Sequence, residues 1–210
     1  MEWQKISPQD IEKRSFEIIS RELGNAHINA EQAPIIKRVI HTTADFDYLQ
    51  NLFFSETAVQ EGLAALKGGA HIVTDTRMAE AGINKTVLAN LGGKVHCFMA
   101  DADVAETAKK RGITRAAVSM EKACALAVPL IIAVGNAPTA LLRLNELIEA
   151  GKILPKLIIG VPVGFVNVVE SKEIIQKAGV PCIIANGRKG GSTVAAAICN
   201  ALLYKISKRP

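Results

Sequence analysis

Five short apolar runs stand out along the chain, and each is continuous rather than alternating with polar residues. A continuous run of this length is typical of a strand that is buried on both faces of a sheet. We therefore expect five buried strands. The runs are "HIVTDT" (71–76), "KVHCFM" (94–99), "PLIIAVG" (129–135), "KLIIGVP" (156–162) and "PCIIANG" (181–187).

Helical patterns separate these runs. Regular alternation of strand and helix predicts parallel strands, right-handed crossovers and helices on both faces of the sheet. The expected fold is a three-layer α/β/α arrangement around a doubly wound, five-stranded parallel sheet, which binds ligands beyond the carboxyl ends of its strands. The helices are expected within "DADVAETAKKRG" (101–112), "TRAAVSMEKACALA" (114–127), "NAPTALLRLNELIEAG" (136–151), "NVVESKEIIQKAG" (167–179) and "GSTVAAAICNALLYKI" (191–206).

An extra helical segment precedes the first strand. The stretch "SPQDIEKRSFEIISRELG" (7–24) predicts a helix that Ser7 can cap and Gly24 can end. Ser15 falls on the apolar stripe of this helix. We therefore expect Ser15 to face inward or toward a neighbouring element.

Two further helices are expected before the first apolar run. One covers 30–40, and the other covers 55–69 with Ser55 as its cap. The chain shows no internal repeat, low-complexity tract or linker. We therefore expect residues 1–210 to form a single domain.

Composition narrows the class of protein. The chain has 210 residues, 49% of them hydrophobic and 21% charged, which is globular composition. No apolar run approaches the roughly 18 to 20 residues that span a bilayer. The beginning "MEWQKISPQD" lacks the pattern of a signal peptide, so we expect a cytoplasmic protein without a membrane partner. The four cysteines form no C-x-x-C pair, and we expect no metal site.

The net charge of +5 and the pI of about 9.1 favour an anionic partner. Nucleic acid is not expected, because the basic residues are scattered and aromatic residues make up only 4% of the chain. A small polyanionic ligand would fit the charge. Charge kept for solubility explains it equally well at this stage.

The loop "NGRKGGS" after the fifth run combines two glycines with Arg188 and Lys189. Gly190 and Gly191 allow a close approach of backbone and ligand, and the helix that follows offers free N–H groups. The loop matches no phosphate-binding motif, so any carboxylate or phosphate would satisfy it. A tight turn with two solvated cations is the alternative.

Three other loops follow the runs. Asn136 can cap the helix after the third run, and this role alone would explain the residue. Asp75, after the first run, can meet a ligand or cap a helix. The loop "GVPVGFV" (160–166) is apolar and carries Phe165, which can pack on a flat ligand or cover the sheet edge.

His41 is the candidate for proton transfer. It follows the helix that carries Lys37 and Arg38, and "TTAD" comes next. A histidine changes charge near neutral pH, and one positioned histidine can act as a general acid or base. The chain has no G-x-S-x-G motif that would indicate a hydrolase. From spacing alone, catalytic and ordinary helix-end roles for His41 remain equally open.

The order of several motifs resembles one family. The motifs are "RSFEII", "KRVIHTTADF", "TDTRMAEAGI", "GNAPTALLRL", "GVPVGFVNVVESK" and "NGRKGGSTVAAAICNAL". Together, from about Pro8 to Leu203, they resemble the precorrin-8X methylmutases of cobalamin biosynthesis, which include the cobalt-precorrin-8 methylmutases. The resemblance implies a flavodoxin-like fold, a homodimer with substrate near the subunit interface, and no protein-bound cofactor.

The resemblance also implies a reaction and its residues. It implies movement of a methyl group from C-11 to C-12 of a corrinoid, an anionic tetrapyrrole. The catalytic histidine of the family falls on His41, and the substrate-binding serine and arginine fall on Ser15 and Arg38. Arg115 resembles another arginine near the macrocycle. The resemblance does not decide whether the substrate carries cobalt.

This reading agrees with the chemistry of the loops. A macrocycle with a rim of carboxylates would suit Arg38, Arg115, Arg188 and Lys189, and a flat ring would suit apolar cover. A methyl shift needs no nucleophile. The alternative is a non-catalytic corrinoid- or flavin-binding module, because fold alone does not separate binding from catalysis.

Overall fold

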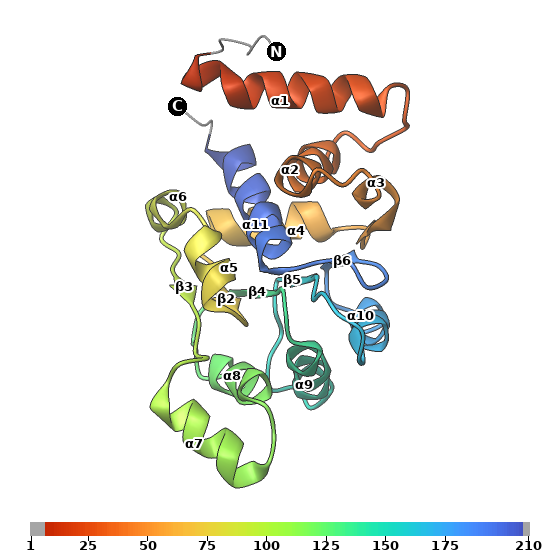
Figure 1. Cartoon of the computed structure of the whole chain (residues 1–210). Coiled ribbons are helices and arrows are strands. Elements are labelled where there is room, and N and C mark those ends of the chain that lie inside the picture. The colour runs from red at the N-terminus through yellow and green to blue at the C-terminus, as the bar shows by residue number, and fades with distance from the viewer. Residues whose placement is uncertain (1–6, 208–210) are drawn as a thin grey trace.

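The computed structural model describes residues 7–207, which fold around one six-stranded sheet (Figure 1). The strands lie in the order β1-β6-β5-β4-β2-β3. Strands β2 to β6 are parallel to one another and coincide with the five predicted runs, which confirms those strands. The strand bounds are β1 Leu52–Phe54, β2 His71–Thr74, β3 Val95–His96, β4 Leu130–Val134, β5 Leu157–Gly160 and β6 Cys182–Ala185.

The winding of the chain reverses between β2 and β4. From β2 the chain moves in one direction to β3, and from β4 it moves in the other direction to β5 and β6. Every residue of β4, β5 and β6 is buried, as their continuous apolar character predicts. The reversal marks the edge at which sheets of this kind bind ligands.

The sixth strand corrects the expectation of a five-stranded, wholly parallel sheet. Strand β1 pairs antiparallel with β6, with Leu52 opposite Ala185. Three residues are too few to show a strand period in the sequence. Ser55 extends this pairing, because its hydroxyl accepts a hydrogen bond from the Cys182 N–H at 2.9 Å. Ser55 therefore does not cap the next helix, and Thr57 occupies that position.

Helices cover both faces of the sheet (Figure 1). Helices α2, α4, α5 and α11 form one outer layer, and α8, α9 and α10 form the other, as the alternation predicted. The helix bounds are α1 Pro8–Leu23, α2 Ala33–Thr43, α3 Tyr48–Asn51, α4 Ala58–Lys67, α5 Arg77–Gly82, α6 Lys85–Asn90, α7 Ala102–Arg111, α8 Arg115–Ala123, α9 Pro138–Glu149, α10 Val168–Gln176 and α11 Ser192–Ile206.

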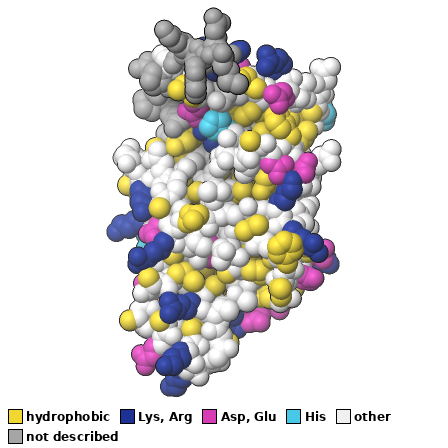
Figure 2. Space-filling model, in the orientation of Figure 1, with side chains coloured by type: hydrophobic (Ala, Val, Ile, Leu, Met, Phe, Trp, Pro, Cys, Tyr) yellow, Lys and Arg dark blue, Asp and Glu magenta, His cyan; other side chains and the backbone are white. Residues whose placement is uncertain are grey.

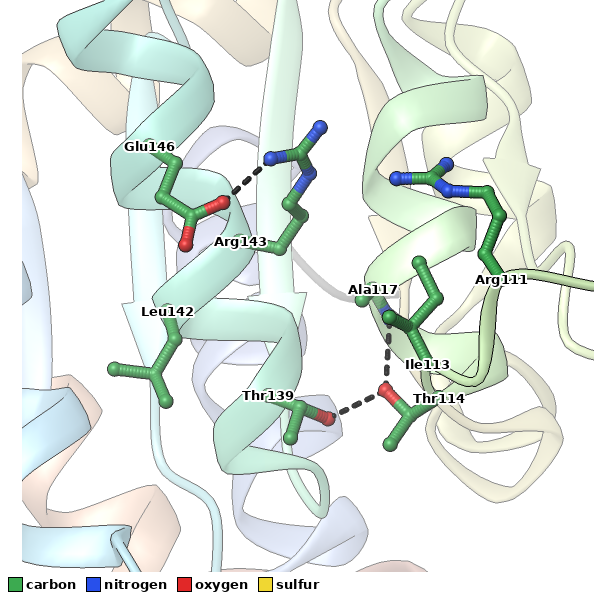
Figure 3. Close-up of a pocket in the computed structure, with 8 residues that line it drawn as sticks. All are labelled: Arg111, Ile113, Thr114, Ala117, Thr139, Leu142, Arg143 and Glu146. Carbon is green, nitrogen blue, oxygen red and sulfur yellow. Dashed lines mark hydrogen bonds and ion pairs between the residues drawn. The ribbon is translucent and has the colours of Figure 1, made fainter. Parts of the chain in front are cut away.

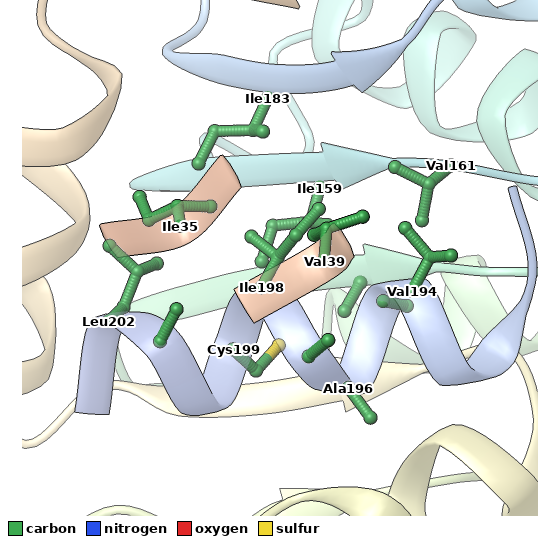
Figure 4. Packing of buried hydrophobic residues seen from close by; sticks show 14 of the residues in the cluster. Ile35, Val39, Ile159, Val161, Ile183, Val194, Ala196, Ile198, Cys199 and Leu202 are labelled. Carbon is green, nitrogen blue, oxygen red and sulfur yellow. The ribbon is translucent and has the colours of Figure 1, made fainter. Parts of the chain in front are cut away.

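Each face of the sheet has its own buried core. On one face, Ile35 and Val39 of α2 pack against Ile198 of α11 and Ile159 of β5 (Figure 4). The neighbouring residue Ile158 lies in the core on the other face. Successive strand residues point to opposite faces, so a continuous apolar strand serves both cores.

Helix α2 is longer than predicted, which changes the setting of His41. The helix runs to Thr43 and ends at Ala44, which has a left-handed backbone conformation with φ of 53°. The hydroxyls of Thr42 and Thr43 donate to the carbonyls of Arg38 and Val39, each at 2.9 Å. His41 therefore lies within the last turn of the helix rather than after it.

The surface shows no concentrated basic patch in the view of Figure 2, where Lys and Arg side chains are scattered among acidic ones. This agrees with the scatter of basic residues along the sequence. Within residues 7–207, no helix is both long enough and apolar enough to cross a bilayer.

Candidate functional site

Asp75 occupies the carboxyl edge of the sheet where the winding reverses. The side chain is fully buried, and its carboxylate accepts the N–H groups of Gly135, Asn136 and Ala137 at 2.8, 2.8 and 2.7 Å. Burial raises the pKa of Asp75, whereas the three N–H donors lower it. Asp75 thus binds the chain itself, joining the ends of β2 and β4.

Neither of the two side chains that could have capped a helix at this edge does so. Thr76, not Asp75, caps α5, since its hydroxyl accepts the Ala79 N–H at 3.1 Å. The cap position of α9 is Ala137, and Asn136 gives its N–H to Asp75 instead. Thr76 also hydrogen-bonds to Ser192 at the start of α11, with the two hydroxyl oxygens 2.8 Å apart.

The loop between β6 and α11 is packed tightly against the loop that follows β5. A Cβ on Gly190 would lie 2.1 Å from the carbonyl oxygen of Val161, and the Gly191 N–H donates to that oxygen at 2.8 Å. Gly190 is therefore required for backbone packing in this structure. These contacts hold the loop backbone in place next to Arg188 and Lys189, which lie between them and β6.

Lys189 ties this loop to the turn that follows α2. Its ammonium lies 2.7 Å from the carboxylate of Asp45 and 2.6 Å from that of Asp47. The hydrogen bond from Lys189 lowers the pKa of Asp45, and the two carboxylates raise the pKa of Lys189. Asp45 is four residues beyond His41, so the basic loop and the end of α2 are neighbours in space.

Arg188 is exposed and lies beside the apolar loop that follows β5. Its guanidinium carbon is 5.4 Å from the centroid of the Phe165 ring. Phe165 is 81% exposed and Val166 is 78% exposed. A cation next to an open apolar surface suits a ligand that is flat in its middle and anionic at its rim.

His41 and Ser15 line the same cavity, between α1 and α2. The His41 ring stacks on the ring of Phe16, with centroids 5.1 Å apart and planes inclined by 9°. Ser15 is half-buried and donates its hydroxyl to the Ile11 carbonyl at 2.9 Å. The cavity has a volume of about 440 Å³ and is lined by Ser15, Ile18, Ile19, Glu22, Ile40, His41, Ala44 and Phe46.

Arg38 lies one turn before His41 and is held by three side chains. It forms an ion pair with Glu12 of α1. Its guanidinium carbon lies 4.7 Å from the centroid of Phe16 and 5.2 Å from that of Tyr204. The structure therefore brings Ser15, Arg38 and His41 together, around Phe16.

Arg115 lies apart from this group. It begins α8 on the opposite side of the sheet from α2 (Figure 1), beside a depression between α7 and α8 of about 650 Å³. A neighbouring cavity of about 310 Å³ lies between α8 and α9, where Thr114 and Thr139 share a hydrogen bond of 2.8 Å (Figure 3). Within one chain, Arg115 does not join Ser15, Arg38 and His41.

Three residues around the site were not singled out from the sequence: Glu12, Phe16 and Lys172. Lys172 is only 1% exposed, although it is a lysine. The sequence did contain a signal for it. Val168, Lys172 and Ile175 are four and three residues apart, so Lys172 stands on the apolar stripe of α10.

The remaining histidines and the cysteines form no metal cluster. His71 and His96 share a hydrogen bond of 2.9 Å between β2 and β3, and burial lowers the pKa of both. Among residues 7–207, no three His, Cys, Asp or Glu side chains lie together as metal ligands would.

Comparison with known proteins gives consistent matches. A sequence model of precorrin-8X methylmutase matches residues 10–205. A cobalt-precorrin-8 methylmutase of Priestia megaterium is 47% identical over 197 residues, which are 94% of this chain and 88% of that protein. A precorrin-8X methylmutase of Pseudomonas aeruginosa is 41% identical over 196 residues, which are 92% of this chain and 94% of that protein.

A solved structure agrees with these matches. The crystal structure of a precorrin-8X methylmutase from Thermus thermophilus superimposes with a TM-score of 0.87 and 39% sequence identity. The superposition covers 95% of this chain and 98% of that one. Sequence and fold therefore point to the same group of proteins.

Proposed function

The chain belongs to the precorrin-8X methylmutase family, and from this premise we propose how its residues carry out the reaction. The protein is an isomerase of cobalamin biosynthesis that moves a methyl group from C-11 to C-12 of precorrin-8. The named relatives are enzymes, which supports catalysis over a non-catalytic corrinoid- or flavin-binding module. The family match and the single sheet support residues 1–210 as one methylmutase domain, and the order of the parallel strands, β3-β2-β4-β5-β6, supports a flavodoxin-like sheet.

His41 acts as the general acid in this proposal. The observation that carries it is the position of His41: it is exposed, it borders a cavity, and its ring rests on Phe16. A proton given to the conjugated ring of the substrate would lower the barrier to methyl migration. Such proton transfer contributes about 10²- to 10⁴-fold in rate.

The cationic groups near His41 bind the carboxylate rim of the substrate. Arg38 is one turn away, and Arg188 lies beside the exposed ring of Phe165, which offers apolar cover for the macrocycle. Ser15 borders the cavity with His41 and supplies a hydroxyl. Lys189 stays a predicted ligand, although a substrate carboxylate must compete with Asp45 and Asp47 for it.

The position of Arg115 supports a site shared between two copies of the chain. In one chain the sheet separates α8 from α2 (Figure 1), so an Arg115 that acts on the same substrate as His41 comes from a second copy. A homodimer would also cover the apolar loop that carries Phe165 and Val166. A cytoplasmic location stays a prediction.

Coexpression of two inactive variants tests the shared site. Chains with His41→Ala and chains with Arg115→Ala should each be impaired when alone. If sites combine His41 of one subunit with Arg115 of the other, random pairing restores about a quarter of the sites. The matched control coexpresses chains with His41→Ala and chains with Arg38→Ala. His41 and Arg38 enter a site from the same chain, so this pair should not restore activity. Absence of recovery in the first pair overturns the shared site.

The reaction itself is tested with two substrates in parallel. We propose cobalt-precorrin-8 as the natural substrate, supported by the name of the Priestia megaterium relative. Absorbance spectra should show conversion of cobalt-precorrin-8 to the corrin chromophore, at a higher kcat/KM than that for precorrin-8X. Binding of both compounds without any spectral conversion would refute the proposed enzymatic function and favour a corrinoid carrier.

A further inference from the structure

Lys172 is a buried cation that pairs with no carboxylate of residues 7–207. Its ammonium donates to the carbonyl of Gly187 at 2.7 Å and to that of Lys189 at 2.9 Å. Burial alone lowers the pKa of Lys172 to about 8. Burying a charge without a counterion is costly, and an apolar residue would fill this stripe of α10 at lower cost.

The two carbonyls belong to the loop that carries Arg188. The carbonyl of Arg188 itself accepts the Gly164 N–H at 3.2 Å. Three successive carbonyls of the loop are thus held by α10 and by the loop after β5. These contacts fix the backbone of residues 187–189 on its buried side. The side chain of Arg188 lies beside Phe165 on the exposed side.

We propose that Lys172 is a positioning residue for substrate binding: it fixes the loop 187–189 so that Arg188 meets a carboxylate of the corrinoid. The unpaired charge of Lys172 also adds positive potential beneath that carboxylate. The inference rests on the proposed function, since it requires Arg188 to bind the anionic rim. Lys172 acts through the loop and does not touch the substrate.

The first test replaces Lys172 with Met, which keeps the length of the side chain and removes the charge. The carboxylates keep their charge during the methyl shift, so their binding is uniform and affects KM rather than kcat. With cobalt-precorrin-8, we expect KM to rise about tenfold and kcat to change less than about twofold. If Lys172 served only the stability of the fold, Lys172→Met would instead lower Tm and leave KM unchanged.

A double-mutant cycle identifies the partner. If Lys172 acts through Arg188, Lys172→Met should raise KM much less in an Arg188→Ala background than in the wild type. Fully additive effects would overturn the assignment. Lys177→Met is the matched control, because Lys177 lies just beyond α10 and is exposed rather than buried.

A pH profile of the wild type keeps the inference testable if Lys172→Met fails to fold. KM should rise between about pH 7.5 and 9.5 as Lys172 loses its proton, and Arg188→Ala should flatten this rise. Other groups near Lys172 stay in one state over this range. Asp45 and Asp47 raise the pKa of Lys189, burial raises the pKa of Cys182 in the adjacent β6 to about 11, and β5 has no titratable side chain.

The outcomes separate this inference from the proposed function. Conversion by the wild type together with an unchanged KM in folded Lys172→Met, or with a flat pH profile, overturns only the role of Lys172. No conversion by the wild type overturns the proposed function, and the inference with it. A raised KM that depends on Arg188 supports both.

Discussion

The imidazole of His41 lies flat against the ring of Phe16, with the ring centroids 5.1 Å apart. This contact joins the last turn of α2 to the middle of α1. His41 also lines the cavity that Ser15 borders. The first two predictions follow from this pair.

Replacing His41 with Ala should lower kcat at least about 100-fold, because the proton donor is lost. KM should change little, since the cationic groups remain. His41 is exposed, so Tm should stay within about 1 °C of the wild type. Steady-state kinetics and thermal unfolding measure the two effects. A variant that keeps near-wild-type kcat would remove His41 from the mechanism.

Replacing Phe16 with Leu should lower kcat about three- to tenfold. The ring orients the imidazole, and aromatic pairs contribute about 0.5–1.5 kcal/mol beyond burial. The kcat of His41→Ala should not fall further when Phe16→Leu is added, because there is then no imidazole to orient. A further fall of the same size in the double variant would show that Phe16 acts independently of His41.

Replacing Glu12 with Gln should lower KM about two- to fivefold. Glu12 pairs with Arg38 and so competes with a substrate carboxylate for the same guanidinium. Glu17→Gln is the matched control, because Glu17 pairs with Arg14 on the exposed side of the same helix. An equal effect of both substitutions would point to the overall charge of α1 instead.

Replacing Asp75 with Asn should destabilise the fold by about 3 kcal/mol. An amide offers only one acceptor oxygen and turns N–H donors toward the N–H groups of residues 135–137. Asp103→Asn provides the comparison, since that carboxylate is 66% exposed and its replacement should shift the urea midpoint much less. Urea unfolding measures both. Similar midpoints for the two variants would contradict the bridging role of Asp75.

The free energy of unfolding should contain a component from Lys172 that increases as pH rises from about 8 to about 10.5. Burial lowers the pKa of Lys172 to about 8. Between this pH and the normal lysine pKa, the unfolded chain binds the proton that the folded chain has lost, so rising pH favours the folded state. Lys172→Met should lack this component. Denaturant unfolding of both proteins at pH 7.5 and 9.5 measures this component. An identical change in the free energy of unfolding between the two pH values would contradict the shifted pKa.

The two effects of pH have opposite directions, which makes Lys172 distinctive. Deprotonation should stabilise the fold and weaken substrate binding. A lysine kept only for stability would show the first effect without the second.

Local sequence patterns were sufficient for the frame of the protein. The strands β2 to β6 were predicted because each is an unbroken apolar run, and the helices α7 to α11 because their sequences carry helical patterns. These signals are local, so they do not depend on which segments later meet. The short helices α5 and α6 between β2 and β3 were not predicted. The strand β1 is too short to carry such a signal, and it was missed.

The group of Ser15, Arg38 and His41 came from resemblance to a family, and the structure places the three residues around Phe16. The roles of Asp75, Lys172 and Lys189 could not be read from the sequence. Asp75 reaches Gly135 across 60 residues, and Lys189 reaches Asp45 across 144. A carboxylate or ammonium has the same chemistry wherever it stands in the chain, and only the partner that folding brings to it decides whether it binds substrate or backbone.

The sequence by itself determined the layers of the fold and the family. The tertiary structure decided which charged groups are already engaged with the chain, and it placed Arg115 on the far side of the sheet from His41. The physical reason is that secondary structure depends on the spacing of apolar residues over a few turns. The state of a charged group depends on burial and on partners that are distant in sequence.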